Sequence, residues 1–463
     1  MERKGLDYDP IFRVPPELQD EDEISMDRIT GQRRHSNNVL TRVTARGQSD
    51  YETPPEKMKE LLGQYLPFLE RDPNQERVDI SAGGVIISVL TNSPNIQRMG
   101  VHNWPKAPPG VVPQIIFYLI TGIPGQAPHF WYCPELRMAL SINSSYYGEM
   151  KSRALGMGMD VLQPMGVHSI HGSCLDIGGR GLVIIAPTGT GKSTLCAMLE
   201  KKVPGTRIHS DDWIYIEFLF DEKGRPRLAI GRYSELFYYM RTATATSQPS
   251  LAEVFENSLL ENVPIDEAGH YIWKGFGNSR ALIDPLNLVS GTTIIAKENR
   301  LARFTSIEKV VFLRRDPASP ELVRLDPAEA VRILSEGKMQ YLPGSGRTGP
   351  GTERWLNPYV LVNRENLIHG TSERALLNID FQNYLFALLF GITGGAYYLN
   401  TAKRTPKESL KILQEIITEP STLALDFDCH AYLTDRIKEA LESYRRDRAE
   451  EMVQIDRRFN GVP

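Results

Sequence analysis

Apolar residues of this chain gather in short runs that are separated by polar turn formers. Between residues 56 and 150, mostly apolar runs occur at 85–90, 115–120 and 138–142. Clusters of Pro and Gly at 104–110 and 122–128 separate these runs. This alternation predicts a mixed N-terminal α/β domain whose strands are joined by turns.

A different pattern follows at 182–199, where five apolar residues (182–186) precede Pro-Thr-Gly-Thr-Gly-Lys-Ser-Thr194. Leu195, Met198 and Leu199 then recur at helical spacing. The order predicts a strand, a glycine-rich loop and the start of a helix. It fits the phosphate-binding loop A/G-x-x-x-x-G-K-[ST], with Ala186 in the first small position.

The residue types of this phosphate loop (186–194) indicate nucleoside triphosphate binding. Gly189 and Gly191 would let backbone N–H groups curl around a polyphosphate, at a helix N-terminus that favours negative charge. Lys192 would reach the β- and γ-phosphates, and the Ser193 hydroxyl would ligate Mg²⁺. The predicted ATP-binding residues are Thr188, Gly189, Thr190, Gly191, Lys192, Ser193 and Thr194.

The remaining patterns complete a division into four parts. Residues 213–218 alternate as a half-buried strand, a turn at 221–224 leads to a second strand near 228–230, and 310–313 form a buried strand. We expect a loosely ordered segment at 1–40, the N-terminal domain at 41–150, a nucleotide- and metal-binding domain at 151–420 and an amphipathic helix at 421–463. That helix packs on its own domain or on a partner, and the Gly/Pro-rich loop 343–351 is a lid or an inert surface loop.

Composition describes an ordinary soluble globular protein of 463 residues, with 41% hydrophobic and 24% charged residues. A formal net charge of −4 gives no attraction to nucleic acid or to anionic membranes. The four cysteines have no C-x-x-C spacing, so neither a disulfide framework nor a zinc site is indicated. Without an apolar leader or a long apolar run, a cytoplasmic enzyme is expected, and the oligomeric state is not indicated.

Acidic residues and a histidine flank the phosphate loop. Asp211 and Asp212 follow it, and two adjacent carboxylates near a nucleotide can divide metal binding and proton abstraction between them. His171 precedes the loop by one short strand pair, so metal ligation by its imidazole is also predicted.

These features together resemble ATP-dependent phosphoenolpyruvate carboxykinases. Tyr146-Tyr-Gly-Glu-Met-Lys151, His171, the phosphate loop and Asp211-Asp212 occur in that family's order. Further matching segments are 235–241, 260–263, Asn278-Ser-Arg280, 351–354 and 396–401, so the likeness spans about 130–415. HPr kinases resemble only the middle of the chain. The resemblance implies a carboxykinase-like fold with mixed sheets, a phosphate-loop domain and a smaller N-terminal domain.

The resemblance also implies roles for individual residues. Asp212 and His171 would bind a second, transition-type metal such as Mn²⁺, and Asp211 would support that metal or contact the ATP-bound metal. Arg280 would bridge the γ-phosphate and the acceptor as an arginine finger does. The other implied contacts are Lys151 to phosphoryl oxygens, Arg241 and Arg404 to the nucleotide, and Tyr146 to the acceptor.

Three departures from the family concern the acceptor side. Ser152 stands where the family has a second, metal-ligating lysine, and a hydroxyl is a poorer ligand with shorter reach. The family's substrate-binding segment has only a partial counterpart at 44–50, where Arg46 would contact the acceptor. The N-terminal domain is also shorter than in the family.

We therefore expect phosphoryl transfer from ATP to an oxygen of an unidentified small-molecule or seryl acceptor. Asp211 is the candidate base for an alcohol. One alternative is a true carboxykinase that converts oxaloacetate and ATP to phosphoenolpyruvate and CO₂. A second alternative, from another class, is a nucleotide-binding regulator without catalytic activity.

Overall fold

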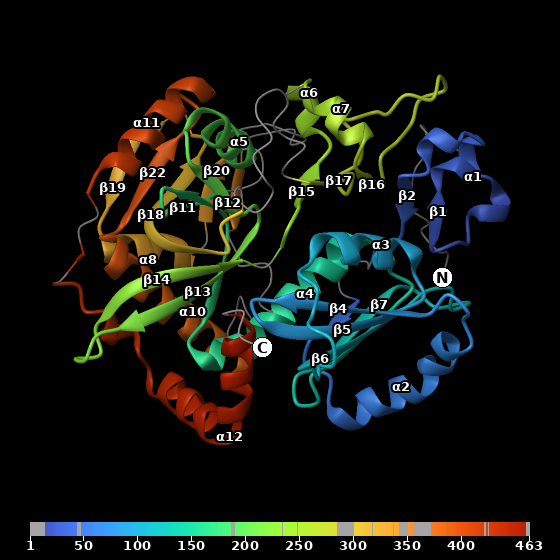
Figure 1. The fold of residues 1–463 in the computed structure, drawn as a ribbon, viewed down its shortest axis with the longest axis horizontal. Helices are drawn as coiled ribbons and strands as arrows, with labels where there is room; N and C mark the ends of the chain where they lie inside the picture. The colour runs from blue at the N-terminus through green and yellow to red at the C-terminus, as the bar shows by residue number, and fades with distance from the viewer. Residues whose placement is uncertain are drawn as a thin grey trace. The chain divides into compact units, whose positions relative to one another are not determined.

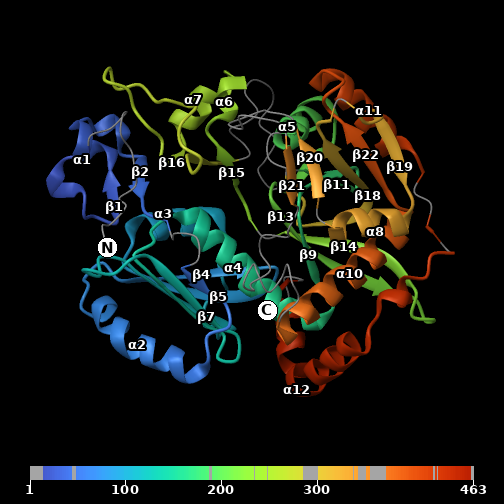
Figure 2. The same cartoon turned by 180° about the vertical axis from the view of Figure 1, so that it is seen from behind.

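Helices and strands both recur throughout the described residues, which confirms the predicted mixed α/β class. The computed structural model describes residues 14–43, 48–186, 190–233, 235–247, 249–284, 301–316, 318–336, 338–341, 351–354, 372–420, 423–424 and 426–459. These residues form two compact units, which are drawn in Figures 1 and 2. Unit 1 holds the described residues up to 160 and 235–284, and unit 2 holds 161–233 and the described residues from 301 onward.

Unit 1 contains a six-stranded sheet in the order β3-β7-β8-β6-β5-β4. The predicted strands 85–90, 115–120 and 138–142 are confirmed as β5, β6 and β8. Helix α2 covers one face of this sheet, and α3 and α4 lie at the other (Figure 1). The elements are β3 (Ser49–Asp50), α2 (Pro55–Glu70), β4 (Glu76–Ala82), β5 (Val85–Thr91), α3 (Pro94–Asn103), β6 (Ile115–Ile120), β7 (His129–Cys133), β8 (Met138–Ile142) and α4 (Tyr147–Leu162), which ends at the unit boundary.

A second, five-stranded sheet of unit 1 has the order β1-β2-β16-β17-β15. It joins strands from the start of the chain to strands that follow residue 235, so a single continuous segment does not build this unit. The sequence-based boundaries group 235–284 with the phosphate-loop domain instead. The elements are β1 (Glu23–Ser25), β2 (Asn38–Thr41), β15 (Tyr238–Arg241), α6 (Thr244–Ser247), α7 (Leu251–Glu256), β16 (Leu259–Glu261) and β17 (Arg280–Ile283).

The expectation of a loosely ordered segment at 1–40 is wrong for residues 14–40, while residues 1–13 lie outside the described part. This stretch forms η1 (Pro16–Leu18), β1, α1 (Met26–Thr30), η2 (Arg33–His35) and most of β2. The reason is a small set of apolar anchors among many charges, because Ile24, Met26 and Leu40 are buried with Ile265. Parallel pairing of β2 with β16 also satisfies its backbone groups.

Unit 2 is built on a nine-stranded mixed sheet whose main path is β12-β10-β11-β18-β14-β13-β9. Strand β22 pairs in parallel with β18, and β19 pairs with β22. The strands are β9 (His168–His171), β10 (Ser173–Ile177), β11 (Arg180–Ile185), β12 (Thr206–Ser210), β13 (Trp213–Phe220), β14 (Pro226–Tyr233), β18 (Phe304–Arg314), β19 (Leu322–Leu325) and β22 (Ala396–Asn400). A separate hairpin joins β20 (Lys338–Tyr341) to β21 (Gly351–Arg354), and the predicted loop between them lies outside the described residues.

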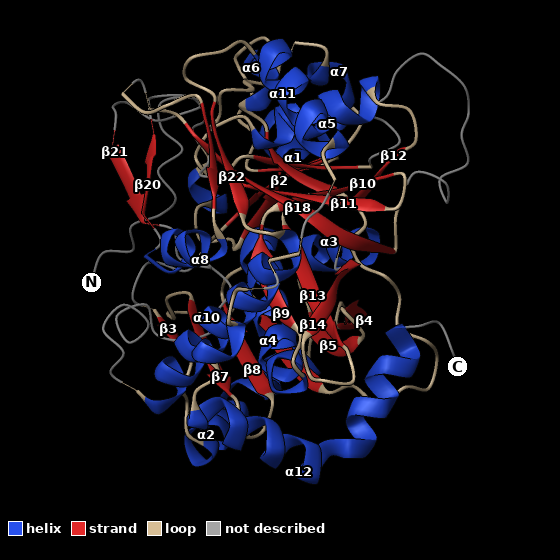
Figure 3. Cartoon of the chain, turned by 90° about the vertical axis from the view of Figure 1, so that its left-hand side faces the viewer, coloured by secondary structure: helices blue, strands red, loops and turns tan. Residues whose placement is uncertain are grey.

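Helices cover both faces of this sheet, with α5 and α11 on one side and α8 and α10 on the other (Figure 3). Phe312 of β18 packs against Phe390 of α10, which places the main core on the α10 side. The helices are η3 (Gln163–Met165), α5 (Lys192–Lys202), α8 (Pro327–Glu336), α10 (Glu373–Thr393), α11 (Pro406–Thr418), η6 (Cys429–Tyr432) and α12 (Asp435–Phe459). Of the amphipathic helix expected at 421–463, residues 435–459 form α12, which has a kink at Arg448 and packs on α10 within its own unit.

Helix α10 is long and apolar enough to cross a membrane by length and composition alone. Most of its apolar window is buried inside unit 2, where Phe381, Leu385 and Phe390 join the core. A mostly buried core helix passes the same test, and this burial accounts for the composition of α10.

Candidate active site

The phosphate loop follows β11 and leads into α5, which confirms the predicted order of strand, loop and helix. Strand β11 is buried and lies between β10 and β18. Gly191 caps α5 with a φ of 107°, a left-handed conformation that favours glycine. The first turn of α5 contains Lys192, Ser193 and Thr194, whose backbone N–H groups precede the regular helical hydrogen bonds. Thr188 and Gly189 lie outside the described residues.

The Lys192 amine lies among polar and acidic groups of β10 and of the turn between β12 and β13. It donates to the Ser173 hydroxyl at 3.0 Å and to the Asp211 carbonyl at 2.5 Å. Its Nζ is 4.0 Å from Asp211 Oδ1 and 3.8 Å from Asp212 Oδ1. The structure thus brings the predicted lysine and both predicted aspartates together.

His171 joins these residues through its contact with Asp212, whose Oδ1 is 2.9 Å from His171 Nε2. The contact follows from strand pairing, because His171 at the end of β9 is opposite Trp213 at the start of β13. Gly172 completes the connection by donating its N–H to the Asp212 carbonyl at 3.1 Å. A Cβ on Gly172 would lie 2.9 Å from the Ile184 carbonyl oxygen, so a larger residue does not fit there.

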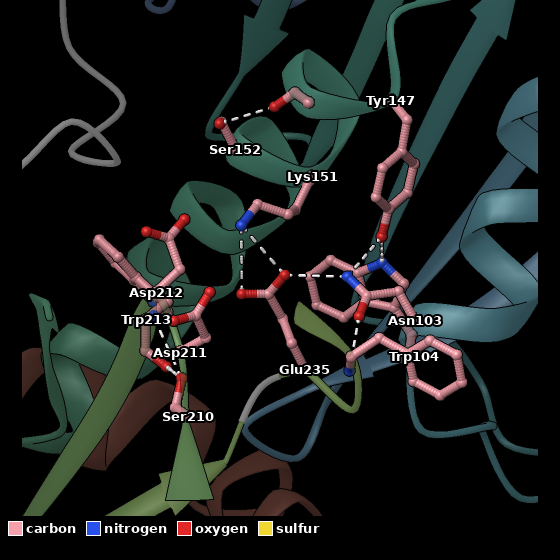
Figure 4. A network of polar contacts seen from close by, with 12 residues as sticks. Asn103, Trp104, Tyr147, Lys151, Ser152, Ser210, Asp211, Asp212, Trp213 and Glu235 are labelled. Carbon is pink, nitrogen blue, oxygen red and sulfur yellow. Dashed lines mark hydrogen bonds and ion pairs between the residues drawn. The ribbon is translucent and has the colours of Figure 1, made fainter. Parts of the chain in front are cut away.

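The turn between β12 and β13 positions the two aspartates. Ser210 accepts a hydrogen bond from the Trp213 N–H at 3.2 Å and donates to the Trp213 carbonyl, which closes the turn around Asp211 and Asp212 (Figure 4). The Asp211 side chain is only 9% exposed, whereas that of Asp212 is 26% exposed. We name His171, Ser173, Lys192, Asp211 and Asp212 the phosphate-loop cluster.

His171 and Asp212 could supply two ligands to a divalent cation. Two adjacent ligands at octahedral bond lengths of about 2.1 Å are separated by about 3 Å, close to the observed 2.9 Å. Within the described ranges, no group of three or more His, Cys, Asp or Glu side chains is placed to hold a metal. A cation at this pair would therefore take its other ligands from water, a hydroxyl or a bound phosphate.

Unit 1 brings together a second set of predicted residues on its five-stranded sheet. Arg280 at the start of β17 is directly opposite Arg241 of β15 on one side and Glu261 of β16 on the other. Residues in direct cross-strand register point to the same face, so two predicted cations and an acid form one row. Segments around 241, 261 and 280 thereby meet in space.

Tyr239 lies at the centre of this second cluster. The Tyr239 hydroxyl donates to Glu261. The centroid of the Tyr239 ring is 5.8 Å from the Arg280 guanidinium carbon and 5.5 Å from the Lys151 Nζ. Tyr146 also forms a side-chain hydrogen bond with Tyr239. We name Tyr146, Lys151, Tyr239, Arg241, Glu261 and Arg280 the arginine–tyrosine cluster.

Glu261 is completely buried and holds the cluster to its surroundings. Its carboxyl accepts hydrogen bonds from the Tyr147 N–H at 2.8 Å and from the Asn95 amide at 2.7 Å. Burial raises the pKa of Glu261 to about 7, although these hydrogen bonds and the charge of Arg280 lower it. The carboxyl therefore titrates near neutral pH.

Lys151 is almost fully buried, and its amine forms an ion pair with Glu235 at 3.1 Å (Figure 4). Glu235 also accepts a hydrogen bond at 2.9 Å from Asn103, whose amide donates to the Tyr147 hydroxyl at 2.8 Å. A buried pair of opposite charges with extra hydrogen bonds is stable only when every partner is present. Any phosphoryl contact by Lys151 would therefore involve the Glu235 carboxylate as well.

Ser152, which the resemblance aligns with a lysine of the carboxykinases, uses its hydroxyl within helix α4. Its Oγ donates to the Gly148 carbonyl at 2.8 Å, one turn earlier (Figure 4). Gly148 itself is required, because a Cβ there would lie 2.6 Å from the Tyr146 ring. The hydroxyl proton of Ser152 is thus engaged by the backbone.

The remaining predicted residues are less closely connected. Arg404 forms a two-point ion pair with Glu321, and both side chains are about one-third exposed. Arg46 lies outside the described residues. From the sequence alone, no role was assigned to Glu235, Tyr239 or Glu261. All three lie in segments on which the resemblance to carboxykinases rests, and their carboxylates and hydroxyl could have marked them as candidate polar residues of the site.

No family model matches this chain, and no curated protein matches it.

Proposed function

We propose that this protein transfers the γ-phosphate of ATP to an oxygen atom of an acceptor. The supporting observation is the phosphate-loop cluster, in which the Lys192 amine at the start of α5 lies within 4.0 Å of both Asp211 and Asp212. A cation, two carboxylates and a helix N-terminus at one point are groups that phosphoryl transfer uses.

Each group has a proposed task in this reaction. The N-terminus of α5 and Lys192 would hold the phosphates, and Ser193 and Asp212 would bind a Mg²⁺ ion that neutralises phosphate charge. Asp211 accepts the proton when the acceptor is an alcohol. His171, whose Nε2 is 2.9 Å from Asp212 Oδ1, would share the ligation of a divalent cation with Asp212.

We further propose that the fold is carboxykinase-like. The arginine–tyrosine cluster supports this, because its six residues come from separate segments that resemble the carboxykinase motifs. Ser152 favours an acceptor other than oxaloacetate, because its hydroxyl is a weaker and shorter metal ligand than a lysine amine and decarboxylation relies on a second metal bound directly by the substrate.

The test is ATP consumption with Mg²⁺ across a panel of hydroxyl-bearing metabolites, seryl peptides and, with Mn²⁺, oxaloacetate. Turnover with a hydroxyl acceptor supports the proposal. Formation of phosphoenolpyruvate from oxaloacetate would support the true carboxykinase instead. ATP binding without turnover on any acceptor would support a non-catalytic regulator.

A matched pair of lysine variants ties the activity to the phosphate loop. Lys192→Ala removes the amine from the cluster and should lower turnover by about 100-fold or more. Lys201→Ala removes the same charge from the exposed end of the same helix and should keep wild-type turnover. Equal activity of both variants would contradict the assignment.

A further inference from the structure

Two arginines that the motifs did not include lie at the same edge of the unit 2 sheet as the phosphate loop. Strands β11, β18 and β22 are parallel, so their carboxyl ends meet at one edge. Arg314 is the last residue of β18 and Arg315 follows it. Since Ile185 is opposite Phe312, both arginines follow the last residue pair of β11 and β18. Ligands of α/β proteins bind at this edge of parallel strands.

The loop that carries Arg315 is held in shape by Asn400, whose side chain is completely buried. The side-chain oxygen Oδ1 of Asn400 accepts from the Asp316 N–H at 3.1 Å, and the side-chain amide Nδ2 donates to the Asp316 carbonyl and to the Ser319 carbonyl. A buried side chain that satisfies several backbone groups fixes a loop. The hydrogen bonds of Asn400 therefore fix the backbone beside Arg314 and Arg315.

Thr401 connects this loop directly to the phosphate loop. Its hydroxyl lies 2.8 Å from the Thr190 carbonyl and 3.2 Å from the Arg314 carbonyl, and its N–H donates to the Arg314 carbonyl at 2.8 Å. One residue thus contacts the backbone of both loops.

The arginines at this edge differ in how their charges are used. The Arg314 guanidinium carbon lies 4.1 Å from the Tyr398 ring centroid and Arg314 donates to the Pro320 carbonyl, while Arg404 is neutralised by Glu321. For Arg315, no ion pair or hydrogen bond to any described side chain is found, and its Nε is shielded from solvent. A shielded guanidinium gains strongly from an anionic partner.

We propose that Arg315 binds a phosphate of the nucleotide, in addition to Lys192. This rests on the proposed function, since it assumes that ATP occupies the phosphate loop. A guanidinium offers two parallel N–H groups to phosphate oxygens, which Lys192 cannot do as a point charge. The phosphate chain would then be held from both β11 and β18.

Binding of ATP and of inorganic tripolyphosphate to the full chain tests this proposal by titration calorimetry. Arg315→Ala should weaken both ligands by about tenfold, Arg315→Lys should weaken them less, and Arg324→Ala should bind as the wild type does. Arg324 is an exposed arginine of β19 in the same unit and serves as the charge control.

The outcomes separate the inference from the proposed function. Wild-type affinity of Arg315→Ala for both ligands overturns the inference and leaves the proposed function standing. A loss for ATP without a loss for tripolyphosphate also overturns it, because the contact would then be to the nucleoside. No binding of either ligand by the wild-type chain overturns both proposals. If Arg315→Ala does not fold, Arg315→Lys carries the same comparison.

Discussion

Removing the charge of the buried Glu261 carboxyl should change how the stability of unit 1 depends on pH. Glu261→Gln keeps the size and an acceptor oxygen for Asn95 and Tyr147, but it cannot ionise. The variant therefore isolates the contribution of one titrating group, because every other titratable residue is shared with the wild type.

The magnitude follows from the pKa of Glu261, which burial raises from 4.5 to about 7. Below pH 4.5 the carboxyl is protonated in both the folded and the unfolded chain, so its ionisation does not change the free energy of unfolding. Between pH 4.5 and 7 it ionises in the unfolded chain but stays protonated in the folded one, so stability falls as pH rises. A pKa difference of 7 − 4.5 = 2.5 corresponds to about 3 kcal/mol at 1.36 kcal/mol per unit.

The assay is urea unfolding of the wild type and Glu261→Gln at several pH values from 4.5 to 8. Amide hydrogen exchange in β16 and β17 would report on unit 1 itself. The free energy of unfolding of the variant should rise relative to the wild type by about 3 kcal/mol across this range. A difference that stays constant, or that changes in the opposite direction, would refute the buried-carboxyl reasoning.

Two further predictions concern unit 2. His168 is buried against Phe386 with no hydrogen-bond partner among the described residues, and burial lowers the pKa of this imidazole to about 3. Below pH 6.5 this histidine therefore takes up a proton in the unfolded chain but not in the folded chain, which destabilises the wild type. In urea unfolding, the free energy of unfolding of His168→Leu should rise relative to that of the wild type by about 2 kcal/mol between pH 7 and pH 5. A difference that does not depend on pH would contradict this reasoning. Gly172→Ala places a Cβ 2.9 Å from the Ile184 carbonyl oxygen and should lower the free energy of unfolding by about 1–3 kcal/mol. Because Gly172 lies beside the phosphate-loop cluster, the same variant should also bind ATP more weakly. The control Gly63→Ala, in a helix with open space around it, should be neutral or stabilising, and equal effects of the two variants in thermal denaturation would argue against the steric reasoning.

Local patterns were sufficient for the elements that carry the phosphate-loop cluster. The apolar run and the Gly-Lys-Ser sequence predicted β11 and α5, and the alternation at 213–218 with its turn predicted the β13–β14 hairpin. These elements could be predicted from short patterns because neighbouring residues determine a strand and a tight turn. The single buried run 310–313 also predicted β18, although that strand begins earlier, at Phe304.

Long-range pairing could not be predicted in this way. Nothing near Asn38 indicates that β2 pairs with β16, more than 200 residues later, and so the division into two interleaved units was not foreseen. The row of Arg241, Arg280 and Glu261 depends on two other pairings, of β17 with β15 and with β16, and no local pattern indicates that these strands are neighbours, which is why the role of Glu261 was missed. Sequence separation hides such contacts because no periodicity spans them.

The central place of β18 has a consequence for synthesis on the ribosome. On the main path of the nine-stranded sheet, β18 is the strand that joins β12-β10-β11 to β14-β13-β9. A nascent chain that has emerged only to residue 284 holds every described strand of unit 1, whereas the strands of unit 2 made so far lack the one between β11 and β14. Unit 1 can therefore fold during translation, while the sheet beneath Lys192 must wait for residues 304–314.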